Sequence, residues 1–556
     1  MLNRLKEKSR LLCSGLTILA FILWVLSSLQ ARGAQTSNMG DLGLFSILPK
    51  YFFLAFSMLV FTFFITLQLA NKNRVLLLCQ TILLILFLYF TPAIVEGTPR
   101  FVFSYGSHRA VDYISQGAQI NPSKLWIHNW PGFSIFWSIF EQLTLIPGMS
   151  ILLTYPTFYN ILLLPPLFMF FRAVSKSSKL AWVAVWFVFL GNWVGQDYFS
   201  MQSFGFFGIA IMLSLLFKNM NQGMRTRQWS ILLFLLSFLI VSTHFLSSLA
   251  ILCVIIVLFL SKHLARYTLL TFFASLVTGW AVFGAGTYLS ENLNRIIEQA
   301  FDLPYIFQVN LTQRISGSAG HILVTQMRVI YSVAIIAFAL LCLVLAWRKR
   351  KLGIVEKRLL SVLVGFSLLL FAFSYGGELF MRLYMLSLLP FAYFISKTAL
   401  KYKYILYALA IFLIIAAPSL HVIAHYGNEI SDYVPYSENV GINFLYNNTV
   451  HGQVIGGVVR YGDFRDPNYH FNYSAISYRK MMDENSSSLL WTAPKELYED
   501  RFVCISYGTT SVFSFFENNA AFIEDIQGNI TQSTSYNLLY SNPSFSIYCS
   551  ESKISR

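Results

Sequence analysis

The chain has 556 residues, of which 56% are hydrophobic and only 12% are charged, and its formal net charge is +15. A soluble domain carries about twice that charged fraction. Several apolar runs approach or exceed the ~20 residues that a helix needs to cross a bilayer. These features exclude an ordinary soluble protein, and no nucleic-acid-binding motif accompanies the basic charge. The sequence predicts an all-α polytopic membrane protein.

Thirteen apolar segments are predicted to span the membrane as helices. They are residues 12–30, 48–70, 75–93, 150–172, 180–196, 203–218, 228–245, 247–262, 268–286, 328–347, 359–374, 383–396 and 403–419. Lysine and arginine clusters fall on the loops that lie on the side of the N-terminus, and the positive-inside rule assigns that side to the cytoplasm. We therefore expect a multi-pass plasma-membrane protein with an extracytoplasmic C-terminus. A cleaved signal peptide is the alternative for the first run, and we favour an uncleaved helix.

Three regions follow from this pattern. Residues 1–74 form an N-terminal transmembrane pair, residues 75–419 form a transmembrane domain with outer loops at 94–149 and 287–327, and residues 420–556 form an extracytoplasmic domain. Residues 419–556 carry 8 basic and 14 acidic residues, a net charge of −6, which leaves +21 on the remainder. Basic anchors beside anionic lipid headgroups explain that excess.

The C-terminal region contains short β-branched and aromatic runs between turn residues, such as GGVVRYGDF and RFVCISYGTT. Such runs predict a small α/β domain. Cys504 and Cys549 are the only cysteines of this region. A disulfide between them would suit the oxidising side of the membrane.

Polar residues that the membrane would otherwise exclude indicate where function lies, because they usually face a cavity or a pathway. The first group lies in the outer loop after the third span. Glu96 is placed where the helix leaves the membrane, and Arg100, His108 and Asp112 follow. His108 and Asp112 have the i, i+4 spacing that shares one helix face. The apolar run 131–146 reads as an interfacial helix. The alternative is a solvated loop whose acids have no function.

The next groups lie at helix turns on the same predicted side. Gln196, Asp197 and Gln202 interrupt an apolar hairpin in GQDYFSMQ. An Asp beside a Gln at such a turn binds something or caps a helix, and both interpretations stay open. His244, in VSTHFLSS, lies in a similar turn and has the same two readings.

The last group combines arginines with an acid. Glu378 and Arg382 are spaced i, i+4 at the mouth of a predicted span, and Arg328 follows the outer loop 287–327, which could serve as a mobile lid. An arginine in a span needs a carboxylate or phosphate partner. The alternative is a Glu–Arg pair that neutralises itself. Acids and arginines at the outer surface suit a lipid-anchored phosphate substrate, with a carboxylate that deprotonates an acceptor hydroxyl.

These features resemble the GT-C class of glycosyltransferases, which use polyprenyl- or dolichyl-phosphate-linked sugars. GQDYFSMQ, THFLSS and GGELFMR are similar to segments of uncharacterised GT-C-like proteins of archaea and bacteria, and the resemblance covers about residues 75–556. It implies an inverting transfer to a glycan, protein or lipid acceptor at the membrane. A divalent metal is compatible with it, although no metal ligand is assigned. No Asp-Glu or Asp-Asp pair follows the third span, and the W-W-D-x-G signature of oligosaccharyltransferases is missing, which argues against en bloc glycan transfer.

The resemblance also implies roles for individual residues. Glu96 would be the base that activates the acceptor, with Asp112 as the competing candidate. Arg382 would bind the donor phosphate together with Arg328. Substrate contacts are expected from Arg100, His108, Gln196, Asp197, Gln202, His244 and Glu378. The rival readings are a transporter or flippase of a lipid-linked glycan and a non-catalytic envelope assembly protein.

Overall fold

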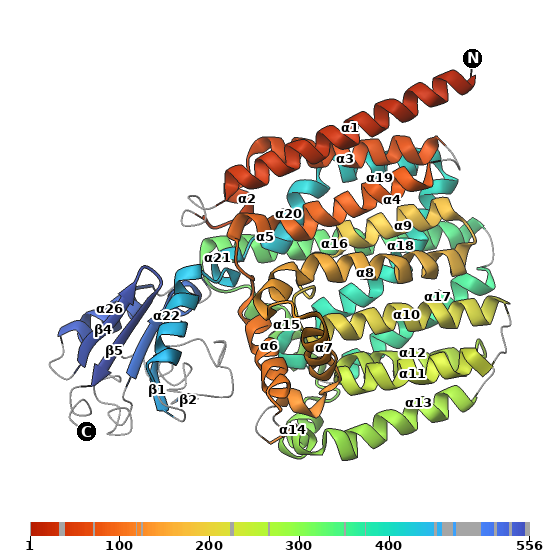
Figure 1. Cartoon of the computed structure of the whole chain (residues 1–556). Coiled ribbons are helices and arrows are strands. Elements are labelled where there is room, and N and C mark those ends of the chain that lie inside the picture. Colours follow the sequence, from red (N-terminus) through yellow and green to blue (C-terminus); the bar gives the residue numbers. More distant parts are fainter. Residues whose placement is uncertain are drawn as a thin grey trace.

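The computed structural model of the chain describes most of its residues. The described residues are 2–32, 39–69, 73–117, 119–123, 126–222, 227–264, 267–349, 352–372, 374–449, 453–458, 471–473, 502–515, 520–532 and 536–550. Long helices lie side by side in one array, with the N-terminus at one end and a small sheet beyond the opposite end (Figure 1). All thirteen predicted segments are largely helical.

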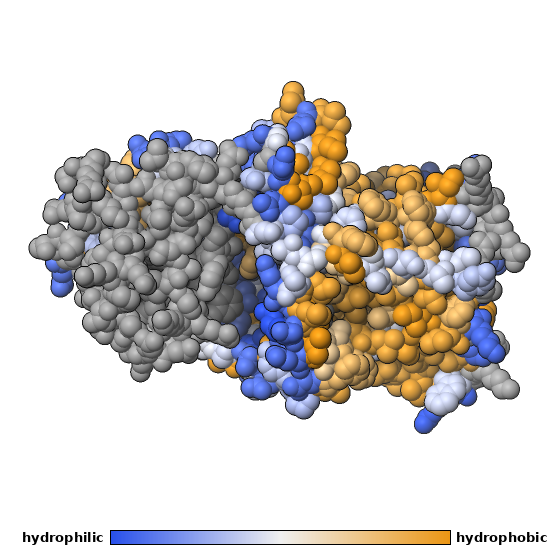
Figure 2. Space-filling view, turned by 90° about the horizontal axis from the view of Figure 1, so that it is seen from below, coloured by the Kyte–Doolittle hydropathy of each residue, from blue (hydrophilic) through white to orange (hydrophobic). Residues whose placement is uncertain are grey.

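The helices of the array are α1 (Leu2–Ala31), α3 (Lys50–Gln68), α4 (Arg74–Ile85) with η2 (Leu86–Phe90) and α5 (Thr91–Glu96), α8 (Gly148–Ser175), α9 (Ser178–Gly191), α10 (Met201–Gln222), α11 (Arg227–Thr243), α12 (Phe245–Leu260), α13 (Tyr267–Gly279) with η4 (Trp280–Gly284), α16 (Ala319–Lys349), α17 (Ile354–Ser367) with η6 (Leu368–Phe371), α18 (Leu379–Lys401), α19 (Lys403–Ile415) and α20 (Ala417–Tyr426). Their apolar side chains form one continuous core. On the face seen in Figure 2, hydrophobic residues cover the middle of the array, and hydrophilic residues gather towards its two ends. The protein is a multi-pass membrane protein.

The predicted count of thirteen spans is higher than length and composition support. Among the described residues, eight helices are long and apolar enough to cross a membrane, and a ninth is added if α19 and the helices after it, bent by 54°, form one span. Helix α9 shows why the count differs. Its 14 residues rise about 21 Å, which is less than a ~30 Å hydrocarbon core. Its last twelve residues are buried, so neighbouring helices shield the non-helical backbone that continues from it.

Shorter helices cover the end of the array nearest the sheet. They are α2 (Leu44–Ile47), α6 (Val102–Ser115), η3 (Trp126–Asn129), α7 (Gly132–Thr144), α14 (Gly286–Gln299), α15 (Leu303–Asn310), η5 (Thr312–Arg314), η7 (Tyr375–Gly377) and α21 (Glu429–Asp432). Helix α7 has the apolar face expected of an interfacial helix, because Phe136, Ile139 and Leu143 are exposed while Phe133 and Trp137 are buried. The predicted helix in 131–146 is confirmed.

The C-terminal region forms a five-stranded mixed sheet with flanking helices. Its elements are α22 (Tyr436–Asn447), β1 (Gln453–Val458), β2 (Phe471–Tyr473), β3 (Phe502–Ser506), α25 (Tyr507–Phe515), α26 (Ala520–Gln532), β4 (Tyr536–Asn542) and β5 (Phe545–Ser550). The strand order is β2-β1-β3-β5-β4, with β1 parallel to β2 and β3, and β5 antiparallel to β3 and β4. A separate small core joins α22 to the sheet.

The structure corrects the expected disulfide. Cys504 and Cys549 are not joined by a disulfide bond. In the pairing of β3 with β5, Cys504 is opposite Ile547 and Cys549 is opposite Phe502. The two cysteines are therefore diagonal neighbours, whose Cα atoms are ~7–8 Å apart. That separation exceeds the usual reach of a disulfide.

Candidate active site

A buried cluster of charged residues lies where the first outer loop begins. Helix α5 ends at Glu96, and Gly97 ends it in a left-handed conformation that glycine adopts without strain. Four residues later, the Nε and Nη2 atoms of Arg100 donate to the two carboxylate oxygens of Glu429 at 2.6 and 2.5 Å. Nη2 also lies 3.4 Å from the Oδ2 atom of Asp432. The first loop is thereby tied to α21, more than 300 residues away.

Glu96 is the carboxylate of this cluster to which Arg100 does not donate a hydrogen bond among the described residues. Its side chain is buried, and neither oxygen accepts a hydrogen bond from an N–H group among the described residues. Its carboxyl group lies within hydrogen-bonding reach of Glu429, a contact that requires a shared proton. Because Arg100 donates to both oxygens of Glu429, Glu96 is the better placed of the two to act as a base once it has released the shared proton.

Asp197 lies next to this cluster, on the non-helical segment between α9 and α10. Its Oδ1 atom is 3.5 Å from Nε2 of His425, a buried side chain of α20. Burial raises the pKa of Asp197, but the attraction of His425 and Arg100 outweighs burial, so the pKa lies below its ordinary value. Asp197 is therefore held ionised within electrostatic reach of Arg100. The neighbouring Gln196 has a buried Oε1 atom without a partner among the described residues.

Two arginines extend the site. Arg328, on α16, donates from Nε to the backbone oxygen of Ala424 at 2.6 Å and stacks on Trp193. It lies within electrostatic reach of Arg100 and Glu429. Glu96, Arg100, Asp197 and Arg328, all singled out in the sequence, thus meet in one charged region.

Arg382 forms the second charged region. Its Nη2 atom pairs with Glu378 one turn earlier on the chain, and Arg314 of the outer loop lies 3.9 Å from the same carboxylate. The Arg382 side chain is only 3% exposed, yet its Nε and Nη1 atoms have no hydrogen-bond partner among the described residues. The Glu378–Arg382 ion pair expected as the alternative is present, but it uses only Nη2 of the three guanidinium nitrogens. Two buried donors remain for an anion.

His244 and Gln202 lie beside Arg382. His244 caps α12, where its side chain accepts from the Ser247 N–H group. Its Nε2 atom lies 2.8 Å from the hydroxyl of Tyr375, and Gln202 donates to the same hydroxyl at 3.0 Å. A structural role for His244 is thus present, and its ring also faces the Arg382 region. Tyr198 connects the two regions, because it follows Asp197 and lies within electrostatic reach of Arg382.

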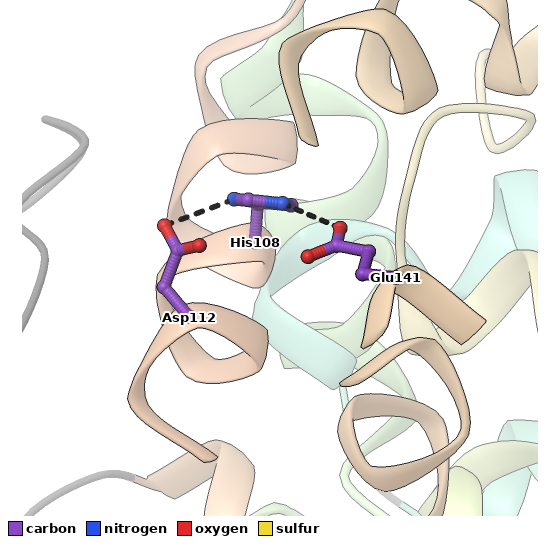
Figure 3. Close-up of side chains that lie close together, drawn as sticks. All are labelled: His108, Asp112 and Glu141. Carbon is purple, nitrogen blue, oxygen red and sulfur yellow. Dashed lines mark hydrogen bonds and ion pairs between the residues drawn. The ribbon is translucent and has the colours of Figure 1, made fainter. Parts of the chain in front are cut away.

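A third cluster contains His108 and Asp112 of α6. The imidazole lies between two carboxylates, with Nδ1 3.2 Å from Asp112 and Nε2 2.7 Å from Glu141 of α7 (Figure 3). Burial lowers the pKa of His108, but the two carboxylates outweigh burial and raise it from 6.5 to about 9. These contacts connect α6 to α7, and the Asp112 carboxylate takes part in them through its ion pair with His108.

The same three residues are the one group of His, Cys, Asp or Glu, among the described residues, whose ligand-type atoms all lie within 4.8 Å of one another. The two carboxylates face opposite nitrogens of the ring (Figure 3). Ligands of a single ion converge on one point, so the arrangement fits a salt-bridged histidine better than a metal centre.

Sequence reasoning missed several members of the site. His421, His425 and Glu429 lie beyond residue 419, where the last predicted span ended, and Glu141 lies in a segment read as apolar. His421 and His425 have the i, i+4 spacing that places both on one face of α20, and Glu429 follows as the first residue of α21. The spacing of the two histidines was the available signal. All three are buried, and His421 and His425 stack at 5.4 Å between ring centroids.

The array of membrane helices, the outer loop with two amphipathic helices and the C-terminal mixed sheet form a polytopic membrane protein that is GT-C-like by its match to solved structures. The fold is similar to that of the Archaeoglobus fulgidus oligosaccharyltransferase. Its apo crystal structure matches with a TM-score of 0.53 and 13% identity over 82% of this chain and 72% of that chain. No family model and no curated protein sequence matches the chain.

Two further structures of the archaeal protein give similar values. The form tethered to an acceptor peptide with an NVT sequon has a TM-score of 0.52 and 13% identity, covering 86% of this chain and 74% of that chain. The AglB complex with an inhibitory peptide and a dolichol-phosphate has a TM-score of 0.51 and 12% identity, covering 87% and 75%. At these identities the likeness concerns the fold.

Proposed function

We propose that the protein is a glycosyltransferase that moves a sugar from a polyprenyl-phosphate-linked donor to an acceptor hydroxyl. The reaction takes place on the extracytoplasmic face, which is the end of the array that carries the sheet. The observation that carries this proposal is the buried Glu96 carboxyl group, which accepts no N–H among the described residues and lies beside Arg100. The archaeal neighbour whose structure contains dolichol-phosphate supports the donor class.

In the proposed reaction Glu96, in its ionised form, takes the proton of the acceptor hydroxyl. The acceptor oxygen attacks the anomeric carbon of the donor sugar, and the bond from that carbon to the phosphate oxygen breaks. The electron pair of the broken bond stays on the phosphate, which leaves as polyprenyl phosphate with inversion at the anomeric carbon. Arg382 stabilises the developing negative charge through its two unpartnered donors, and Arg314 adds a second positive charge.

The residues around Glu96 prepare it for this step. Arg100 neutralises Glu429, so that Glu96 does not face an unpaired carboxylate. Asp197 and Gln196 line the region on the side of α9 and α10, and they would contact the sugar or the acceptor.

The test is transfer from a radiolabelled polyprenyl-phosphate hexose to cell-envelope acceptors in membranes that contain the protein. We expect Glu96→Gln to abolish transfer while the protein stays folded. Glu291→Gln is the matched control, because Glu291 is an exposed acid of α14. Full activity of Glu96→Gln would refute its role. Loss in Asp112→Asn instead would move the base. Inactivity of the wild type with every donor, together with a glycolipid that becomes accessible outside, would establish transport.

A further inference from the structure

A cavity of about 280 Å³ lies at the start of the first outer loop, next in the chain to the proposed base. Its walls come from three parts of the chain: the segment 97–99, the first turns of α8, and one face of α22. Gly97, in the wall, is the residue next to Glu96. The volume lies near the lower end of the ~300–1,000 Å³ typical of small-molecule sites. The cavity therefore suits a ligand of small size held beside Gly97, the residue that follows Glu96.

The lining has a distinctive chemistry. All ten lining residues are uncharged. The polar ones are Thr98, Ser150, Asn439 and Asn443, which offer hydroxyl and amide groups that both donate and accept hydrogen bonds. Tyr436 is 73% exposed and places an aromatic ring at the cavity. Neutral hydrogen-bonding groups with one aromatic face suit a neutral polyhydroxylated ring, whereas a phosphate or carboxylate would find no cation in this lining.

The walls are fixed before any ligand binds. The Thr98 hydroxyl donates to the backbone oxygen of Val434 at 2.7 Å, just before α22 begins. The Tyr105 hydroxyl donates to Pro99 at 2.9 Å and accepts from the Asn439 amide at 3.4 Å. These bonds connect the start of the outer loop to α22. A preformed site loses less entropy on binding than one that must be ordered by its ligand.

From this geometry we infer that the cavity is the acceptor subsite and that the acceptor is a neutral carbohydrate. The inference rests on the proposed function and names its substrate class. A hydroxyl of the bound sugar would point towards Glu96, while Tyr436 covers one face of the ring and Asn443 holds its hydroxyl groups. An extended peptide commonly binds along a strand edge, and helices and a loop segment, but no strand, line this cavity.

The first experiment measures binding without any donor, so that its result does not depend on the chemistry. The full-length protein is placed in nanodiscs free of glycoside detergents, and saturation-transfer NMR reports the binding of neutral disaccharides such as maltose and mannobiose. We expect Tyr436→Ala and Asn443→Ala each to weaken binding about 3- to 10-fold, the effect of losing one stacking or hydrogen-bonding contact. Val440→Ala is the control on the same helix, because Val440 does not line the cavity.

A blocking variant and a second acceptor complete the test. Ser150→Leu fills the cavity mouth from the exposed first turn of α8 and should abolish binding, whereas Tyr436→Phe keeps the ring and should retain it. No disaccharide binding by the wild type, or binding that none of these variants changes, would overturn the inference. Transfer to a peptide that Tyr436→Ala leaves unchanged would also overturn it while the glycosyltransferase proposal stands. Disaccharide binding that depends on Tyr436 without any transfer would keep the subsite and refute the enzyme.

Discussion

The proposed contact between the Arg382 guanidinium and the donor phosphate predicts how far activity falls when the guanidinium is removed. Its side chain is 3% exposed, and two of its nitrogens, Nε and Nη1, have no partner among the described residues. A hydrogen bond to a charged group contributes about 1.5–3 kcal/mol. Two such bonds to a phosphate give at least about 3 kcal/mol, which is about a 150-fold fall in kcat/KM when they are lost. We therefore expect Arg382→Met to lower kcat/KM for the lipid donor by about two orders of magnitude.

The stability of this variant should change little. Glu378, the partner that Arg382→Met leaves behind, is 37% exposed and can be solvated by water. Arg382→Lys keeps the charge but loses the planar fork of donors, so we expect an intermediate loss of about tenfold. Glu378→Gln is the control, because it removes the carboxylate without removing a donor.

The assay follows initial rates with a radiolabelled polyprenyl-phosphate hexose in nanodiscs, with polyprenyl phosphate as the competing product. Thermal unfolding of each variant is measured in parallel. Activity of Arg382→Met within threefold of the wild type, in a protein that unfolds at the same temperature, would refute the reasoning. Arg382 would then be the structural half of a Glu–Arg pair.

Three further outcomes can be measured on the same preparations. The pKa of His108 is raised from 6.5 to about 9, so the stabilising contribution of protonated His108 is complete below pH 6.5 and is lost as pH rises through about 9. The unfolding temperature of the wild type should therefore fall across that pH range. An equal fall in His108→Phe would contradict this. A Cβ atom on Gly148 would lie 2.1 Å from Nε2 of His108, whereas a Cβ atom on Gly286 would meet nothing within 4 Å. In equilibrium unfolding, Gly148→Ala should lower the free energy of unfolding by about 1–3 kcal/mol, and Gly286→Ala should leave it unchanged. Arg100→Met leaves the buried Glu429 unpaired and should lower the free energy of unfolding by about 3–5 kcal/mol. The double variant Arg100→Met with Glu429→Leu should recover most of that loss. If the effects of the two substitutions simply add, Arg100 and Glu429 do not act as a pair.

The sequence predicts those parts of the fold that local physics determines. Long apolar segments become helices because the bilayer leaves their backbone no other partner, and residues 131–146 contain the predicted helix with an apolar face. The fold likeness to the archaeal oligosaccharyltransferase agrees with the GT-C resemblance stated from the spans, the outer loop and the segments GQDYFSMQ, THFLSS and GGELFMR. Glu96 lies at the helix end where the sequence places it, and its catalytic role stays a prediction.

Non-local pairing could not be predicted in this way. The last span was expected to stop at residue 419, but the chain bends at Ala416 and continues as α20, which brings His425 beside Asp197. Glu429 pairs with Arg100 across 329 residues, and only the packing of the whole array fixes that meeting. The expected disulfide failed for a related reason, because the register of β3 and β5 sets Cys504 diagonal to Cys549.

The separation of Arg100 and Glu429 along the chain has a consequence for biosynthesis. At ~5–20 residues per second, a ribosome takes at least about 16 seconds to make the 329 residues between them. Throughout that time Arg100 has neither Glu429 nor Asp432 to pair with, and the surroundings of Glu96 are incomplete. A chain that terminates before residue 429 would therefore insert its early helices and still lack the partner of Arg100. The charged site around Glu96 is therefore complete only after the last membrane helices have been made and packed.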